Sequence, residues 1–131
     1  MKDPKKSFSP SEAELEILQV LWEIEPATVR QVHERLQSKR KVGYTTTLKQ
    51  MQRMTEAPKN MLLKLDESTP HQFKAIVRES EVQKTMFKRL LDTAFKGSAM
   101  QLVMHALGEA KTDPEEIAQL EAWLQKQKDH E

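Results

Sequence analysis

The N-terminal part of the chain carries apolar residues at helical spacing. Leu15, Leu18 and Trp22 recur three and four residues apart, which predicts a helix with one core-facing stripe. Ser9 is expected to cap this helix, because a serine side chain can accept a hydrogen bond from an amide of the first turn. The helix should end before Pro26, since proline cannot continue it comfortably.

Two further helices follow this segment. Thr28 and Gln31 have the spacing of a capping box and predict a short second helix through Leu36. Gly43 gives a flexible break, after which a third helix is expected over residues 44–56. The inward side of this third helix would carry Leu48, Met51 and Met54.

A hairpin is expected after the three helices. Residues 61–65 and 72–77 have strand-like content, and the turn-forming residues 66–70 separate them. Three helices followed by a hairpin is the winged-helix arrangement. In that arrangement the third helix enters the major groove of DNA, and the hairpin, or wing, lies along the backbone.

Beyond Arg78 the pattern becomes wholly helical. Capping signals that start at Ser80, Ser98 and Asp113 predict three amphipathic helices, and Gly97 is expected to end the first of them. About fifty residues cannot bury three apolar faces alone, because small cores are marginal, so a second copy of the chain should cover them. The expected dimer interface consists of Met86, Leu90, Leu102, Val103, Leu107, Ile117, Leu120, Trp123 and Leu124.

These patterns together predict a mainly α fold with a small β-hairpin wing. Residues 1–78 would form a winged helix-turn-helix domain that binds DNA. Residues 79–131 would form a helical dimerisation domain.

Charge is distributed unevenly, although the net charge is only +1. Residues 1–78 carry 14 Lys/Arg against 10 Asp/Glu, or +4, whereas residues 79–131 carry 7 against 10, or −3. Within residues 28–64 nine basic side chains stand against two acidic ones, which gives +7. That window is where an anionic partner is expected to bind.

The third predicted helix has a continuous polar stripe opposite its apolar side. Arg and Lys suit guanine or phosphate, Gln suits adenine, and Thr suits phosphate or a thymine methyl group. The same stripe also fits an ordinary solvated helix face, and the charged window favours DNA. The expected DNA-binding residues are Arg40, Lys41, Tyr44, Thr45, Thr46, Lys49, Gln50, Arg53 and His71.

Other function classes find little support in the sequence. Cysteine is absent, which excludes disulfides, thiolate metal sites and cysteine nucleophiles. The four histidines lie too far apart for a short-spaced metal motif, and no catalytic or phosphate-loop motif occurs. We therefore expect no enzyme activity, no cofactor and no metal. No segment approaches the roughly 18 apolar residues of a membrane helix, so a cytoplasmic protein without membrane insertion is expected.

Three motifs in order carry a family resemblance. Residues 11–18 (SEAELEIL), 26–32 (PATVRQV) and 44–49 (YTTTLK) resemble the BlaI/MecI penicillinase-repressor family of bacterial winged-helix regulators. The likeness extends over nearly the whole chain. It implies a homodimer that binds an inverted-repeat operator in double-stranded DNA and represses resistance or stress-response genes.

The resemblance also implies a route to derepression. In the family a membrane metalloprotease sensor inactivates the repressor by cleavage in its C-terminal part, and the cut bond aligns with His105–Ala106 here. Two segments depart from the family pattern. The connection over residues 56–61 is longer and free of glycine, and the wing over residues 68–73 offers fewer cations.

A rival hypothesis comes from another functional class. A protein-interaction adaptor could keep the winged-helix scaffold without binding DNA, and the weak wing and near-neutral total charge favour it. Such an adaptor would bind a protein partner and show no affinity for duplex DNA.

Overall fold

A computed structural model describes residues 9–65, 69–109 and 113–130 of the chain. The chain divides into two compact units, Met1–Phe87 and Lys88–Glu131, and each is considered by itself. The expected turn at Asp66–Ser68 lies outside the described residues, as does most of the charged N-terminal segment. The boundary between the DNA-binding and dimerisation functions at residue 78 stays a prediction.

Helix α1 (Glu12–Ile24) begins after Ser11, so the expected cap at Ser9 is wrong. The Ser11 Oγ accepts from the Glu14 amide at 3.2 Å, and the Ser11 amide donates to Glu14 Oε1 at 2.9 Å. Ser9 and Glu12 have the same spacing, but Glu14 is also held by Lys59 through an ion pair. This long-range contact holds the Glu14 carboxylate in place and so supports the capping box at Ser11.

Helices α2 (Val29–Gln37) and α3 (Tyr44–Thr55) agree with their predicted positions. The Thr28 side chain accepts from the Gln31 amide, and the Gln31 side chain accepts from the Thr28 amide, which confirms the predicted capping box. Gly43 is the N-cap of α3 and supplies no side-chain bond. The start of α3 therefore depends on contacts from other elements.

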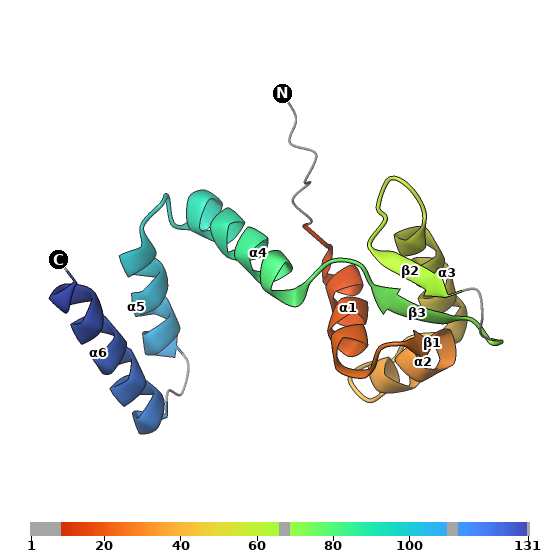
Figure 1. Cartoon of the computed structure of the whole chain (residues 1–131), viewed down its shortest axis with the longest axis horizontal. Coiled ribbons are helices and arrows are strands. Elements are labelled where there is room, and N and C mark those ends of the chain that lie inside the picture. Colours follow the sequence, from red (N-terminus) through yellow and green to blue (C-terminus); the bar gives the residue numbers. More distant parts are fainter. Residues whose placement is uncertain (1–8, 66–68, 110–112, 131) are drawn as a thin grey trace. The chain divides into compact units, whose positions relative to one another are not determined.

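The predicted hairpin is present as β2 (Leu62–Leu65) and β3 (Gln72–Ala75), in antiparallel register with Leu62 opposite Ala75. A third strand, β1 (Ala27–Thr28), pairs with β3 and was not predicted, so the sheet order is β1-β3-β2. Figure 1 shows the three strands beside α1, α2 and α3 in the N-terminal unit. Two residues are too few to leave a strand pattern in the sequence.

The core of the N-terminal unit lies between the three helices and the inner face of the sheet. Trp22 closes one edge of this core, because its Nε1 donates to the Val77 carbonyl at 3.1 Å. Val82, from the first turns of the next helix, is buried in the same cluster, and Met86 packs against it. The buried apolar residues are Ile17, Leu18, Val20, Leu21, Ala27, Val29, Val32, Leu36, Met51, Met54, Met61, Leu62, Phe73, Val77 and Val82.

The remaining chain forms α4 (Glu79–Ala94), α5 (Ala99–Glu109) and α6 (Pro114–Asp129). Ser80 lies inside α4 as its second residue, so the capping box expected there is wrong. The other two caps are confirmed, because Ser98 accepts from the Gln101 amide and Asp113 from the Glu115 amide. Gly97, at φ +82°, follows the end of α4 as expected.

Candidate nucleic-acid interface

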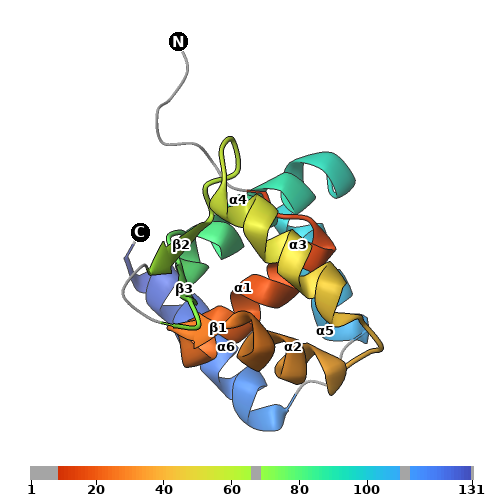
Figure 2. The ribbon, with the colours of Figure 1, turned by 90° about the vertical axis from the view of Figure 1, so that its right-hand side faces the viewer.

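The buried residues of α3 show which side of the helix is exposed. Thr47, Met51 and Met54 are buried, and α-helical residues advance by about 100° each, so the opposite side carries Lys49 at its centre. Thr45 and Arg53 flank Lys49 one turn before and after it, and both are exposed. Figure 2 looks onto the side of the N-terminal unit that carries α3 and the sheet. We call this exposed strip of α3 the reading face.

The two glutamines of α3 differ in exposure and in their position around the helix. Gln50, an expected DNA contact, is only partly exposed and lies about 100° from Lys49 towards the buried side. Gln52 is exposed and lies only about 60° from Lys49, on the side of the hairpin. The structure thus places Gln52, which sequence reasoning missed, within the reading face. Sequence reasoning counted Leu48 among the inward residues, whereas the structure buries Thr47 and leaves Leu48 partly exposed, which turns Gln52 outward.

A polar cluster holds the beginning of α3. The buried His33 of α2 has its Nδ1 3.3 Å from Thr47 Oγ1, and its ring meets the Tyr44 ring edge-on at 5.5 Å. The Arg30 guanidinium lies 5.3 Å from the centre of the same Tyr44 ring, which is cation–π geometry. Since Gly43 gives no side-chain cap, these contacts from α2 orient the first turn of α3.

Arg40, an expected phosphate ligand, is engaged within the protein. Its Nη2 and Nε lie 2.7 Å and 3.1 Å from Glu16 Oε1 of α1. The hydrogen bond from this guanidinium, opposed by desolvation, lowers the pKa of the Glu16 carboxyl below its usual range. The same carboxylate raises the pKa of Arg40. Arg40 therefore anchors the turn before α3 onto α1, while its neighbour Lys41 is exposed.

Lys59 forms a second ion pair to α1, with its Nζ 2.7 Å from Glu14 Oε2. The Glu14 side chain is 5% exposed. Burial acts to raise the pKa of Glu14, but the hydrogen bonds from Lys59 and Ser11 outweigh it, so the pKa lies below its usual value. This pair fixes the turn between α3 and β2, where Asn60 adopts the φ of +45° that a glycine would otherwise supply.

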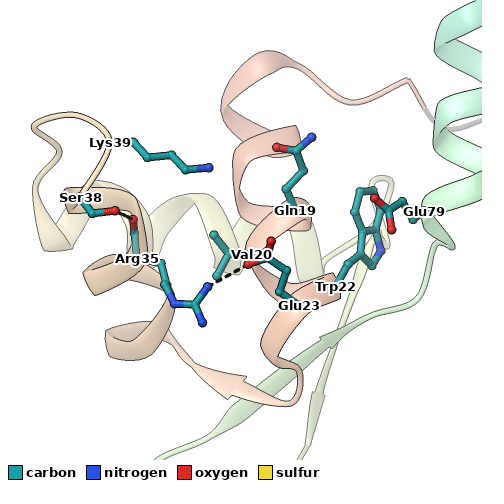
Figure 3. Close-up of a pocket in the computed structure, with 8 residues that line it drawn as sticks. All are labelled: Gln19, Val20, Trp22, Glu23, Arg35, Ser38, Lys39 and Glu79. Carbon is teal, nitrogen blue, oxygen red and sulfur yellow. Dashed lines mark hydrogen bonds and ion pairs between the residues drawn. The ribbon is translucent and has the colours of Figure 1, made fainter. Parts of the chain in front are cut away.

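Arg35 makes a third ion pair, to Glu23 of α1 at 2.9 Å. Figure 3 shows the two side chains pointing towards each other. Both line a hollow of about 440 Å³, to whose lining Trp22 also belongs. Lys39 lines the same hollow and also acts on Glu16 electrostatically.

Three of the nine cations in the window 28–64 are thus paired with glutamates of α1, which lie outside that window. The remaining cations are Arg30, Lys39, Lys41, Lys49, Arg53 and Lys64.

A groove of about 720 Å³ runs between α3 and the hairpin. One bank is formed by the side of α3 that carries Tyr44 and Gln52, and the other by the hairpin with Lys64 and His71. The first residues of α2, including Arg30, close one end. The groove adjoins the reading face, because Gln52 belongs to both. His71, an expected DNA contact, is exposed in this groove and not on the reading face.

The C-terminal unit leaves its apolar side chains open to solvent. Among its described residues none is buried, and several large apolar side chains are about half exposed. Leu102, Leu107 and Ile117 are partly buried. His105 and Ala106 lie exposed in the middle of α5, where the His105 ring contacts that of Phe95. The exposed members are Leu90, Met100, Val103, Met104, Leu120, Trp123 and Leu124.

Two site types receive no support from the part of the chain that the structure describes. No cluster of three His, Asp or Glu side chains there could hold a metal ion. No described helix combines the length and the apolar character that crossing a membrane requires.

Comparison with known proteins identifies the family to which the chain belongs. The model of the family described as penicillinase repressor matches residues 10–126. The transcriptional regulator BlaI of Mycobacterium tuberculosis, from strains CDC 1551 and H37Rv, is 31% identical over 113 residues. That alignment covers 81% of this chain and 80% of the relative. These matches confirm the resemblance found in the sequence. The chain belongs to the penicillinase repressor family, and it is a transcriptional repressor, not an enzyme.

Proposed function

We propose that this repressor binds an inverted-repeat operator as a homodimer, with α3 of each copy in the major groove. The observation that carries the proposal is the reading face, on which Lys49 and Arg53 stand one turn apart beside Thr45. The side chains of an exposed helix of this length can reach base edges once the helix enters the major groove. Lysine and arginine there supply donors for guanine or phosphate.

The test is a gel-shift series with operator DNA from the region upstream of the repressor's own gene. Lys49→Ala and Arg53→Ala should each weaken binding by on the order of 1–3 kcal/mol if the side chain makes a bidentate base contact. Arg35→Ala is the matched control, because it removes one cation that points to Glu23 between α1 and α2. Unchanged affinity for both α3 variants, or equal losses for the control, would refute the assignment.

The C-terminal helices are proposed to hold the dimer. Leu120, Trp123 and Leu124 present one apolar strip along α6 at 39%, 57% and 52% exposure, which a second copy would cover. Trp123→Asp should shift sedimentation of the full-length protein from dimer to monomer. Ala122→Asp, at an exposed position on the side of α6 opposite Leu120 and Leu124, should leave the dimer intact. A Trp123→Asp protein that sediments as a dimer would refute this arrangement.

Derepression is proposed to follow cleavage near His105–Ala106. This bond lies within α5, so a protease needs local opening of the helix before it can cut. Within one chain no described residue of the C-terminal unit is buried, so opening of α5 is opposed mainly by the contacts that the second copy makes with it. Immunoblots of induced cells test the idea. Rising target transcripts with intact repressor would exclude cleavage as the switch.

A further inference from the structure

The groove between α3 and the hairpin has an apolar floor. Phe73 and Val29 form buried parts of this floor, at 5% and 7% exposure. Leu48 and Pro70 add apolar surface to its lining. Apolar surface combined with a few polar or charged groups is typical of small-molecule sites, and the groove's 720 Å³ lies within their usual volume of roughly 300–1,000 Å³.

Two cations stand at the rim of the groove. Lys64 lies directly opposite Phe73 in the antiparallel register of β2 and β3, so both side chains project from the same face of the sheet. The Arg30 guanidinium lies 5.3 Å from the centre of the Tyr44 ring, and this contact uses the face of the cation and leaves its in-plane N–H groups available. Among the described residues, the ion pairs to carboxylates include neither Arg30 nor Lys64. Each can therefore donate to an oxyanion in the groove.

The lining of the groove selects both the shape and the charge of a ligand. An aromatic body would pack against Phe73 and the Tyr44 ring, and a single carboxylate would meet the cations of the rim. A second negative charge is disfavoured, because the Glu56 carboxylate also lines the groove, at the end of α3. A free phosphate, which has no apolar part, gains nothing from the floor.

We propose that this groove binds a small aromatic monocarboxylate and that its binding weakens the binding of DNA. Gln52 belongs to both the groove and the reading face, so a ligand in the groove lies beside the DNA that α3 would read. The carboxylate also neutralises positive charge of Arg30 and Lys64, which lowers the potential next to the reading face. The regulatory part of this inference rests on the proposed DNA-binding function, whereas the ligand site does not. The repressor would then respond to a small molecule as well as to cleavage.

The first experiment titrates the full-length protein with 2-naphthoate in the absence of DNA, by isothermal titration calorimetry. Two further probes separate the contributions, because 2-naphthamide has the same rings without the charge and inorganic phosphate has the charge without the rings. Each should bind at least about tenfold more weakly than 2-naphthoate, since it lacks the charge-assisted hydrogen bond or the apolar contact. In labelled protein, 2-naphthoate should shift the amide signals of residues 28–31 and 72–73, which include the groove lining on α2 and β3.

Matched variants locate the site. Arg30→Ala and Lys64→Ala should each weaken 2-naphthoate binding on the order of tenfold. Glu56→Gln should strengthen it by removing a repulsive charge. Lys74→Ala is the control and should leave the affinity unchanged, because Lys74 lies opposite Leu63 on the other face of the same hairpin. Thermal melts of each variant check that the fold is kept.

The second experiment repeats the gel shift with operator DNA at increasing concentrations of 2-naphthoate. Operator affinity of the wild type should fall by at least about fivefold at saturation, the lower end of typical coupling between two sites. Because such coupling is reciprocal, operator DNA should lower the affinity for 2-naphthoate by the same factor. Lys74→Ala should respond as the wild type does, and 2-naphthamide at equal concentration should have no effect.

The outcomes separate the ligand site from the DNA-binding function. If 2-naphthoate does not bind, binds no better than 2-naphthamide, or binds the wild type and both cation variants equally, the groove is not the proposed site. If it binds as predicted but operator affinity does not fall, the regulatory part is wrong. If the protein binds no duplex even without 2-naphthoate, the DNA-binding function fails while the ligand site stands.

Discussion

The ion pair between Glu14 and Lys59 should stabilise the N-terminal unit and hold the turn after α3. Replacing Glu14 by Gln keeps an oxygen that can accept from the Ser11 amide but removes the negative charge opposite Lys59. Replacing it by Ala removes both. The two variants therefore separate the ion pair from the helix cap.

The expected magnitudes follow from exposure. The Glu14 side chain is 5% exposed and that of Lys59 is 40% exposed, so Lys59 can regain water when its partner is lost. Glu14→Gln should then destabilise by only about 1 kcal/mol, near the lower end for a partly buried pair. Glu14→Ala should lower the free energy of unfolding by about a further 1 kcal/mol, because the acceptor of the capping box is also removed. Together with Lys59→Met, a double-mutant cycle should assign about 1 kcal/mol to the pair.

The pH dependence gives a second readout of the same pair. The pKa of Glu14 is lower in the folded protein than its ordinary value of 4.5, so the unfolded chain binds more protons between the two values. The stabilisation is fully present above pH 4.5 and is lost as the pH falls through the folded pKa. The difference between wild type and Glu14→Gln should shrink over that acid range.

Urea unfolding followed by circular dichroism, from neutral pH down to the acid range, measures both effects. If Glu14→Gln unfolds at neutral pH with the same free energy as the wild type, the ion pair contributes nothing to stability. A difference between the two proteins that stays constant at acid pH would show that the lost interaction is not the charge.

Three further outcomes are expected. Glu16→Gln should release Arg40 from its ion pair, so affinity for any duplex should rise and the salt dependence should steepen in a filter-binding titration. Gln52→Ala should reduce discrimination at one operator position by about 1–3 kcal/mol in competition against single-base variants, whereas Gln50→Ala should alter no position. Trp22→Phe should lower the free energy of unfolding by about 1 kcal/mol in urea titrations, because it loses its indole hydrogen bond.

The helices of the N-terminal unit were predictable because their signals are local. Thr28 and Gln31 form the capping box that their spacing predicts, and Met51 and Met54 are buried on the expected side of α3. The start of the first helix could not be predicted from local sequence signals alone. Ser9 and Ser11 are each followed three residues later by a glutamate, so the local pattern does not distinguish them. In the structure Ser11 is the cap, and its partner Glu14 also contacts Lys59, which lies 45 residues later in the chain.

The candidate site was less predictable because charge in a sequence window says nothing about pairing. Arg40 precedes the reading helix, yet it is bound to Glu16, 24 residues earlier. Nothing in the sequence distinguishes Arg30 from its neighbours in a short helix, but its guanidinium lies 5.3 Å from the centre of the Tyr44 ring. Position in three dimensions thus separates anchoring cations from those that face the groove.

The glutamates of α1 give this separation a physical cause. Glu14, Glu16 and Glu23 each form an ion pair with one basic residue of α2 or of the turns on either side of α3. Each pair fastens that turn or helix to α1. A cation that is paired with a carboxylate must give up that contact before it binds a phosphate, so its net contribution to DNA binding is smaller than that of an unpaired cation by the worth of the pair. The basic residues of the window that form no ion pair with α1 lie in the turn before α3 (Lys39 and Lys41), on the exposed side of α3 (Lys49 and Arg53) and around the groove (Arg30 and Lys64). The acidic helix therefore shapes the proposed DNA-binding surface without touching it, and removing any one of its three carboxylates should extend that surface to a cation that now serves the fold.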